Sequence, residues 1–485
     1  MSEAIVRLQI GGELRDAASG ATFERRNPLT GAVATRASAG GVVDAIAAAD
    51  AAAVALPGWS ALGPNDYRAL LLKAADAVAA KGDAFVAAMM TETGATEAWA
   101  RFNVRLAAGM VREAAALTTQ VSGEVIPSDK PGSLAMAIRE PAGVVLGIAP
   151  WNGPVILGVR AIATPLACGN TVILKASELC PRTHALIIEA FAEAGFPAGV
   201  VNLVTNAPED APDVVGALID HPAVRRISFT GSTKVGRVVA ERAGRNLKPV
   251  LLELGGKSPL LVLEDADLDE AVKAAAFGAF FNQGQICMST ERIIVVDAVA
   301  DAFVERFAAK AATMVAGDPS EGRAPLGALI DRKAAENAAV LIADALAKGA
   351  TRVVGDPAEG MLMNATVIDH VTADMALYAQ ESFAPMVAVI RARDEADGIR
   401  LANDSDYGLT AAVFTRDVAA GLRVARQIKS GMCHINGPTV HDEAQMPFGG
   451  TKDSGYGRFG GKAGIDQFTE LRWITVETQP GHYPI

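Results

Sequence analysis

The chain has 485 residues, of which 50% are hydrophobic and 20% are charged, with a formal net charge of −11 at pH 7. This length predicts two or three domains, and the negative charge argues against a nucleic-acid-binding protein and against binding to an anionic membrane. Four cysteines are too few for a disulfide framework, and neither they nor the six histidines have metal-ligand spacing, so we expect no metal site and a reducing, cytoplasmic location.

The N-terminal part of the chain is predicted to be helical. Its first residues, MSEAIVRLQIGGELRD, lack the basic and apolar regions of a signal peptide. Residues 42–118 have the spacing of successive amphipathic helices, clearest in LGPNDYRALLLKAADAVAAKGDAF (62–85). The alanine-rich run 45–56 is apolar, but Asp50 interrupts it and we expect it to be too short to span a bilayer.

Short apolar runs alternate with helix-like segments from residue 143 onward. The strand-like runs are 143–150, 171–175, 200–204, 225–230, 249–254 and 259–263. Continuous apolar strands that alternate with helices predict a parallel sheet covered on both faces. A second alternating series over 256–436 predicts a second α/β domain, whereas 119–141 is hairpin-like and is expected to form an arm with 470–485.

Polar residues follow the ends of several predicted strands. Asn152, in IAPWNGP, follows a rigid Pro-Trp corner, so its amide could stabilise an oxyanion, although Asn is also common in ordinary turns. Lys175 and Glu178, in TVILKASE, could hold ribose hydroxyls, and a carboxylate there would repel a 2′-phosphate and favour NAD over NADP. Gly231-Ser232 precedes a helix start, which suits a pyrophosphate but is equally typical of a simple helix cap.

A carboxylate and a thiol complete the set of candidate catalytic groups. Glu253, in LLELGGKSP, ends a strand at the edge where ligands bind in open α/β sheets. Cys287 lies in the polar turn FNQGQICMST (281–290), between a predicted helix at 268–280 and a strand-like run at 292–296. Taken separately, the first can be a surface cap and the second a structural cysteine, but together they supply a nucleophile and a base. A thiol with a pKa near ~8.5 is mostly protonated at neutral pH, so we expect local donors or Glu253 to lower the pKa of Cys287.

Two further motifs carry less information. GYGRFG (455–460) matches the glycine pattern of a dinucleotide site, but no apolar strand precedes it, so we interpret it as a flexible loop. ESFAP (381–385) places Glu381 and Phe383 just before a strand-like segment, where they could contact a second ribose and a nicotinamide.

The motifs PWN, KASE, FTGST, ELGGKSP, QGQIC, ESFAP and PFGG, in this order, resemble the aldehyde dehydrogenase superfamily over nearly the whole chain. The resemblance implies an α/β fold with two doubly wound α/β domains, one a Rossmann-like NAD-binding domain (1–118 and 142–255) and one catalytic (256–469). The third part is a small β oligomerisation arm (119–141 and 470–485) that builds a homodimer or homotetramer. It further implies Cys287 as nucleophile, Glu253 as general base and Asn152 as oxyanion donor. The implied NAD contacts are Ile148, Pro150, Trp151, Lys175, Glu178, Phe229, Gly231, Ser232, Val235, Leu254, Glu381 and Phe383.

Within the superfamily, NGPVILGVRAIATPLACGN, HINGPTVHDEAQMPFGG and the terminal HYPI are similar to the vanillin and salicylaldehyde dehydrogenase branch. This similarity favours NAD-dependent oxidation of an aromatic aldehyde, with vanillin to vanillate ahead of salicylaldehyde or benzaldehyde-type substrates. Gly153 leaves room for a flat ring, and Arg160 could meet a ring oxygen or form a structural ion pair. The implied substrate contacts are Gly153, Ile156, Arg160, Ile286, Met288, Thr439 and Phe448.

Two rival activities remain open from the residues. A cysteine hydrolase acting without NAD would need a histidine base, and only His434 and His441 are near in sequence order. A CoA-acylating aldehyde dehydrogenase generally lacks the carboxylate found here as Glu253.

Overall fold

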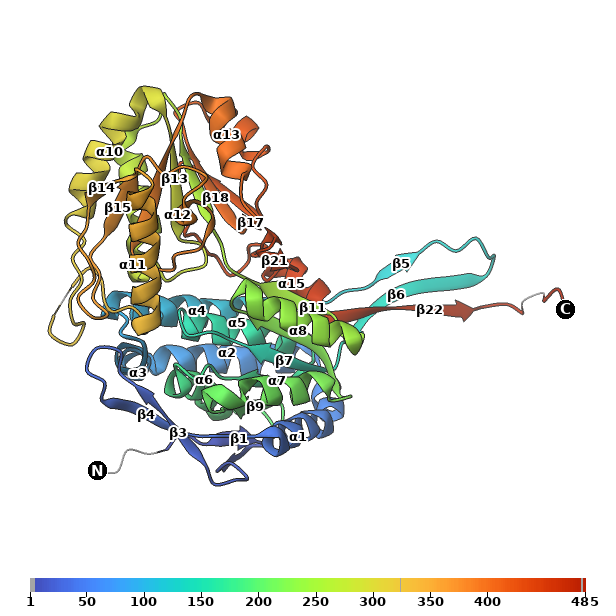
Figure 1. The fold of residues 1–485 in the computed structure, drawn as a ribbon. Helices are drawn as coiled ribbons and strands as arrows, with labels where there is room; N and C mark the ends of the chain where they lie inside the picture. Colours follow the sequence, from blue (N-terminus) through green and yellow to red (C-terminus); the bar gives the residue numbers. More distant parts are fainter. Residues whose placement is uncertain (1–4, 323, 481–482) are drawn as a thin grey trace.

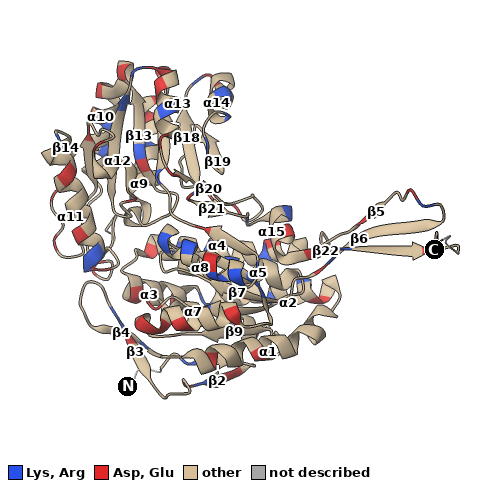
Figure 2. Ribbon diagram, turned by 45° about the vertical axis from the view of Figure 1, so that its right-hand side comes forward, with Lys and Arg blue, Asp and Glu red and all other residues tan. Residues whose placement is uncertain are grey.

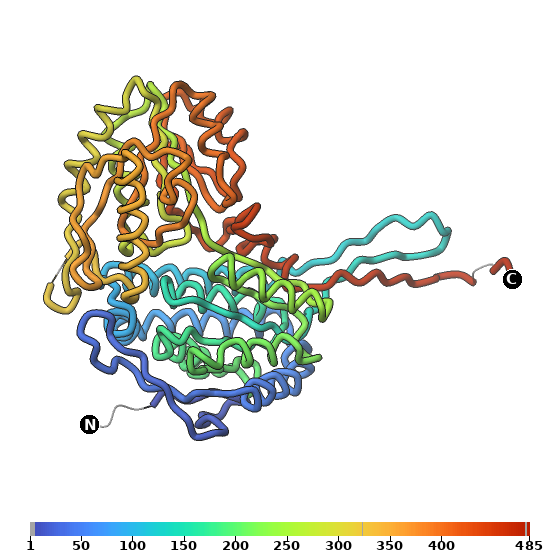
Figure 3. Tube along the Cα trace, viewed as in Figure 1, coloured from blue at the N-terminus to red at the C-terminus, as the bar shows by residue number. Residues whose placement is uncertain are grey.

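The computed structural model describes residues 5–322, 324–480 and 483–485. Two α/β bodies lie one above the other, and a thin three-stranded arm projects from their junction (Figure 1). The first half of the chain builds one body and the second half builds most of the other (Figure 3). Acidic and basic residues are interspersed over the outer helices (Figure 2).

The first body is built on an eight-stranded sheet of order β2-β1-β9-β8-β7-β10-β11-β21. Its five central strands are parallel, and three short strands extend its edges, each paired antiparallel with its neighbour. The central strands are β7 (Val144–Ile148), β8 (Thr171–Lys175), β9 (Val201–Val204), β10 (Val224–Thr230) and β11 (Val250–Glu253). The edge strands are β1 (Leu8–Ile10), β2 (Glu13–Arg15) and β21 (Gly455–Tyr456), and a separate hairpin pairs β3 (Thr22–Arg26) with β4 (Val33–Ser38).

Eight helices pack on this sheet and on one another. They are α1 (Val42–Ser60), α2 (Pro64–Ala80), α3 (Gly82–Thr93), α4 (Glu97–Leu117), α5 (Pro154–Ala167), α6 (Pro181–Glu193), α7 (Ala211–Asp220, preceded by the 3₁₀ turn Pro208–Asp210) and α8 (Thr233–Arg245). Proline occupies the first position of α5 and of α6, where it fixes a helical φ. Its missing N–H costs no hydrogen bond there, because the N–H groups of the first turn have no partner within the helix. Gly147 allows close packing, since a Cβ there would come within 2.9 Å of Ala161 on α5.

The second body contains a seven-stranded sheet of order β14-β15-β16-β13-β12-β18-β19, parallel except for β14. Its strands are β12 (Ser258–Val262), β13 (Thr290–Val296), β14 (Thr351–Val354), β15 (Thr366–Asp369), β16 (Met386–Ala392), β18 (Thr410–Phe414) and β19 (Met432–Ile435). Its helices are α9 (Leu268–Phe280), the 3₁₀ turn η2 (Phe281–Gly284), α10 (Asp297–Ala311), α11 (Arg332–Ala347), α12 (Ala376–Ala379), α13 (Glu395–Asn403) and α14 (Val418–Ala425). The pair β17 (Tyr407–Gly408) and β20 (Thr451–Lys452) lies beside it, and α15 (Gly461–Phe468) returns to α4 and α5 of the first body.

The arm is an antiparallel sheet of β5 (Glu124–Ile126), β6 (Ser133–Pro141) and β22 (Thr469–Glu477). The predicted α/β fold with two doubly wound sheets and a separate β arm is therefore confirmed, and α9 occupies the helix predicted at 268–280. The residue boundaries assigned to the three parts stay a prediction. Residues 1–4, 323, 481 and 482 of those parts lie outside the described residues.

Two sequence interpretations were wrong. The alanine-rich run is part of the 19-residue helix α1, which is long and apolar enough to cross a membrane by length and composition alone. In the structure it packs on α7, β8 and β9 and carries the buried Asp44, so tertiary contacts explain its apolar face. The segment 455–460 is not a flexible loop, because Tyr456 and Gly455 pair with Leu252 and Glu253 and fix it to the sheet.

Candidate active site

The ends of the central strands form one continuous edge in the first body. Strand pairing aligns Lys175 with Ile148, Ile148 with Phe229, and Thr230 with Glu253. β8 pairs with one side of β7 and β10 pairs with the other, so the strand order reverses at β7. Open α/β sheets bind ligands at the carboxyl ends of their strands at such a switch point. The predicted strand-end residues therefore lie along a single edge.

The second body presents Cys287 to the same edge. After Glu253 the chain enters β12, whose Ser258 pairs with Thr290 of β13, so the segments that precede these two strands lie side by side. Gly256 makes this approach possible, since a Cβ at that position would lie 2.3 Å from the Cys287 carbonyl oxygen. Pairing of the two strands thus brings a thiol from the turn before β13 to a carboxylate at the end of β11.

The turn before Cys287 is held in an unfavourable backbone conformation. Asn282 and Gln283 have φ values of 50° and 56°, in the left-handed region that side chains other than glycine rarely adopt. Their own amides and that of Gln285 fix the turn: Asn282 Nδ2 donates to the Asn152 carbonyl (3.1 Å), Gln283 Nε2 to the Ala328 carbonyl (3.1 Å), and the Ile330 N–H to Gln285 Oε1 (2.9 Å). The polar residues around the cysteine therefore build the turn.

Glu253 is a buried carboxylate beside the thiol. It is 1% exposed, and neither of its oxygens has a hydrogen-bond partner among the residues that the structure describes. Burial raises the pKa of Glu253 to about 7, and the contact with the Cys287 thiol and the positive charge of Arg160 oppose this shift only partly. A carboxyl group with a pKa near neutrality can both accept and release a proton at physiological pH, as a general base must.

The expected lowering of the Cys287 pKa was wrong. Desolvation raises the pKa of this thiol well above its ordinary value, and the negative charge of Glu253 raises it further, while Arg160 acts weakly in the opposite direction. The thiol is therefore protonated at rest. Its neighbour Glu253 is the group placed to take the proton when the sulfur reacts.

The Asn152 side chain is fixed by a hydrogen bond from one of its two N–H groups. Its side-chain Nδ2 donates to the Gln285 carbonyl at 3.0 Å, and its own carbonyl accepts from Trp99 Nε1 at 2.8 Å. An amide nitrogen has two N–H groups, and no second acceptor is found within the described ranges. The remaining N–H can serve an oxyanion formed at Cys287.

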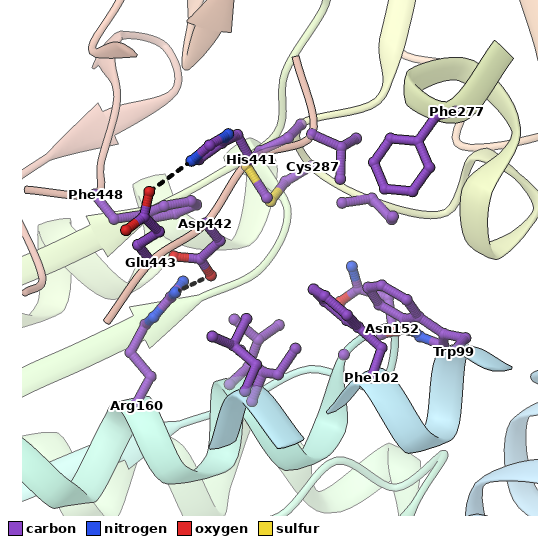
Figure 4. Close-up of a pocket in the computed structure, with 17 residues that line it drawn as sticks. Trp99, Phe102, Asn152, Arg160, Phe277, Cys287, His441, Asp442, Glu443 and Phe448 are labelled. Atoms are coloured by element: carbon purple, nitrogen blue, oxygen red, sulfur yellow. Dashed lines mark hydrogen bonds and ion pairs between the residues drawn. The ribbon is translucent and has the colours of Figure 1, made fainter. Parts of the chain in front are cut away.

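Two cavities meet at Asn152 and Cys287. The first, with a volume of about 300 Å³, is mainly apolar and is shown in Figure 4. In this view Arg160, Asp442 and Phe448 lie toward one end and Trp99, Phe102 and Phe277 toward the other, with Cys287 between them. Of the predicted substrate contacts, those that line this cavity are Gly153, Ile156, Arg160, Ile286, Met288 and Phe448.

Thr439 does not line the cavity. Its fully buried hydroxyl donates to the Met288 carbonyl at 2.7 Å and lies 2.8 Å from the Thr290 hydroxyl, so it supports the Cys287 turn from behind. Sequence reasoning missed several lining residues: Trp99, Phe102, Leu106, Phe277, Val440, His441, Asp442 and Glu443. The one available signal was the spacing of Trp99, Phe102 and Leu106 along a single face of α4, which also suits ordinary core packing.

Arg160 forms a structural ion pair, the alternative that the sequence left open for this residue. Its Nη2 donates to Asp442 Oδ2, with side-chain exposures of 6% and 8%. The guanidinium also lies over the rings of Phe448, at 4.2 Å, and Phe459, at 5.4 Å. The pair still borders the cavity, so the ion pair does not remove Arg160 from the substrate side.

The second cavity, of about 330 Å³, extends from Cys287 along the strand ends. The predicted cofactor contacts that line it are Pro150, Trp151, Gly231, Ser232, Leu254, Glu381 and Phe383. Ile148 and Phe229 lie buried at the ends of β7 and β10, and Val235 is exposed in the first turn of α8.

This cavity suits a dinucleotide. The Ser232 hydroxyl accepts from the Val235 N–H at 3.4 Å and caps the 13-residue helix α8, whose N-terminus can bind phosphate. Phe383 has a φ of 50° and meets Trp151 edge to face with ring centroids 5.8 Å apart, which gives a flat group an aromatic wall. Burial raises the pKa of Glu381 to about 8, and its Oε1 accepts from the Gly256 N–H at 2.8 Å.

Lys175 and Glu178 form an ion pair at the end of β8. Glu178 Oε1 also accepts from Asn206 Nδ2 at 3.0 Å, so the carboxylate is fixed in place. Among the residues that the structure describes, no group of three or more histidine, cysteine or acidic side chains is arranged to bind a metal ion.

Comparisons with known proteins agree with this geometry. The model of the aldehyde dehydrogenase family matches residues 14–474. Vanillin dehydrogenase from Pseudomonas sp. (strain HR199 / DSM 7063) is 59% identical over 480 residues, 99% of each chain. The crystal structure of a salicylaldehyde dehydrogenase from Pseudomonas putida G7 with salicylaldehyde is 49% identical, with a TM-score of 0.98 over 99% of each chain. Betaine aldehyde dehydrogenase from Staphylococcus aureus with NAD+ is 31% identical, with a TM-score of 0.95 over 99% of this chain and 96% of that one. The chain therefore belongs to the aldehyde dehydrogenase family.

Proposed function

We propose that this protein oxidises an aromatic aldehyde, with vanillin the favoured substrate, to the carboxylic acid with NAD. The observation that carries the proposal is the pair of cavities that meet at Cys287. One has walls of aromatic and aliphatic side chains that suit a flat ring, and the other has the helix N-terminus, aromatic wall and buried carboxylate that suit a dinucleotide. The 59% identity to a vanillin dehydrogenase supports vanillin over salicylaldehyde, which stays the alternative.

The side chains support a covalent route. The Cys287 sulfur attacks the aldehyde carbon as the thiol proton passes to Glu253, and the carbonyl oxygen becomes an oxyanion bonded by the free N–H of Asn152 and the backbone N–H of Cys287. Bound NAD supplies the hydride acceptor. The oxyanion then re-forms a carbonyl, which leaves the acyl group on Cys287 as a thioester. Glu253 then releases the thiol proton to solvent and, ionised again, removes a proton from water as the oxygen of that water adds to the thioester carbon. The carbon–sulfur bond breaks to release the acid, and the sulfur takes the proton back from Glu253, which regenerates the thiol and the carboxylate.

The rival activities have less support. His441 lines the substrate cavity, and its Nε2 is bonded to Glu443 Oε1 at 2.9 Å. Among the described residues, neither its ring nor that of His434 forms a hydrogen bond with the Cys287 sulfur, as a hydrolase base would need. Glu253 is instead the main charged neighbour of the thiol. A buried carboxylate in that position also supports hydrolysis of the thioester over transfer to CoA.

NAD in preference to NADP forms part of the proposal. The fixed Glu178 carboxylate lies at the end of β8, next to the strand that leads to Asn152. A negative charge there would repel a 2′-phosphate, whereas its free lone pairs can accept hydrogen bonds from a ribose.

We also propose a homo-oligomer, either a dimer or a tetramer, assembled through the arm. Exposed apolar side chains on this thin sheet include Trp473 (79%), Val125 (70%) and Leu471 (63%), an unusual surface for a projection in water. A Trp473→Asp variant examined by sedimentation velocity should shift toward monomer.

We further propose that the protein is cytoplasmic. Its four cysteines are free thiols, which a reducing cytoplasm would keep in that form.

The experiment that tests this function compares kcat/KM for vanillin, salicylaldehyde, benzaldehyde and a long-chain alkanal, with NAD and NADP in parallel and a Cys287→Ala variant as the inactive control. We expect the aromatic aldehydes with NAD to be preferred. Equal or better rates with the alkanal would refute the aromatic assignment, and acid production without a nicotinamide cofactor would favour the hydrolase.

A further inference from the structure

A buried acceptor without a partner lies in the wall of the substrate cavity. Asp442 follows β19 in the loop that covers α5, and its side chain is 8% exposed. Oδ2 accepts from Arg160, but Oδ1 is buried and has no hydrogen-bond partner within the described ranges. Buried polar atoms are nearly always hydrogen-bonded, so an acceptor left without a donor beside a ligand cavity indicates that the ligand brings one.

The ion pair keeps this acceptor in a fixed place. Arg160 comes from the middle of α5, and its guanidinium lies over the rings of Phe448 and Phe459. Asp442 is the one acceptor found for its five N–H donors among the described residues, so the guanidinium also has donors to offer. Together, the two side chains present an acceptor and donors at one end of the cavity (Figure 4).

The rest of the cavity gives a ring substituent few other polar partners. Asn152 and Cys287 are committed to the reacting carbonyl. His441 and Glu443 lie at the exposed rim, and their polar atoms bind each other at 2.9 Å. The other lining side chains are apolar or aromatic, so a ring hydroxyl entering the cavity meets the Arg160–Asp442 pair as its buried polar contact.

We propose that Asp442 is a specificity-determining residue that accepts a hydrogen bond, through Oδ1, from a hydroxyl group on the aromatic ring of the aldehyde. Arg160 donates to the same ring oxygen, so the pair recognises a group that is at once donor and acceptor. An apolar substituent of the same size leaves both partners unsatisfied, and sites of this kind reject such analogues strongly. The inference rests on the proposed function and narrows its substrate class to hydroxylated aromatic aldehydes.

The test compares isosteric substrates. For each ring position, kcat/KM is measured for the hydroxybenzaldehyde and the corresponding methylbenzaldehyde, at a pH below the pKa of the ring hydroxyl. In the wild type, the hydroxyl-to-methyl ratio should be about 10 or more at the best position, the factor that one charge-assisted hydrogen bond contributes. A ratio of one or less at all three positions would overturn the proposal without any variant being made.

The variant D442N then identifies the acceptor. Its amide oxygen must face the donors of Arg160, so its NH2 group takes the place of Oδ1 and an acceptor becomes a donor. We expect the hydroxyl-to-methyl ratio to fall about 10-fold or more, mainly through KM. The control D397N changes a buried, arginine-paired aspartate that lines neither cavity, and it should keep the wild-type ratio. Effects of D442N on the shared chemical steps, through the pKa of Glu253, cancel in the ratio.

A merely structural role of Asp442 would lower the rate for both members of each pair alike and leave the ratio unchanged, and that result would overturn the inference. Failure of the proposed function has a different signature: the wild type would oxidise neither the hydroxybenzaldehydes nor the methylbenzaldehydes with NAD.

Discussion

Replacing Glu253 by glutamine should slow both the attack of the Cys287 thiol on the aldehyde and the hydrolysis of the thioester. The side chain is buried, its pKa is raised to about 7, and it is the main charged neighbour of Cys287. Glutamine keeps its shape but cannot accept a proton. A positioned general base contributes ~10²–10⁴ in rate, so we expect kcat to fall by about that factor. Loss of the carboxylate also removes a charge that raises the pKa of the Cys287 thiol, so attack should recover as the pH rises, whereas hydrolysis stays without its base. Above pH 8 the acyl group should therefore accumulate on Cys287 and be visible by mass spectrometry of the quenched enzyme.

The ionisation of Glu253 should also be visible in the dependence of the wild-type kcat on pH. With a pKa of about 7, Glu253 is half ionised at pH 7 and about 1% ionised at pH 5, so a deacylation-limited kcat should fall about 50-fold between these values and level off above pH 8. Glu381→Gln is the matched control, a buried carboxylate of the cofactor cavity whose loss should not build up acyl-enzyme. A Glu253→Gln rate within about 10-fold of the wild type would refute the assignment, as would a flat profile from pH 5 to 8.

Three further changes test separate parts of the site. Burial raises the pKa of Glu381 from 4.5 to about 8, so its contribution to stability is present below pH 4.5 and lost as the pH rises through 8. Glu381→Gln should therefore melt at a higher temperature than the wild type at pH 9 and at a similar one at pH 4.5, whereas a lower melting temperature at pH 9 would contradict this. Glu178→Gln should raise the NADP-to-NAD ratio of kcat/KM about 10-fold, the effect of one charge repulsion removed, and an unchanged ratio would place the 2′-hydroxyl elsewhere. Asn152→Ala should lower kcat by ~10²–10³ through loss of an oxyanion donor, and a normal kcat in steady-state assays would assign that role to another group.

Local sequence patterns were sufficient for most of the secondary structure. Apolar runs of five to eight residues between helical segments predicted β8 and α9 at their observed bounds, because alternation of this kind has few solutions other than a covered parallel sheet. The motifs, taken as a set, identified the family, and they predicted a catalytic cysteine, glutamate and asparagine that the structure places around one cavity. The prediction for 455–460 failed because pairing with β11 is a contact across about 200 positions of the chain, which no local pattern records.

The sequence by itself determined the strands, the helices and the residue types at the strand ends, because these depend on neighbours within one turn or strand. Tertiary structure alone decided what those residues can do. It placed Glu253 beside Cys287, and burial with a nearby negative charge raised the thiol pKa that the sequence had suggested would be lowered. It also turned Thr439 away from the cavity and paired Arg160 with Asp442, since hydrogen bonding and desolvation depend on which segments meet in space.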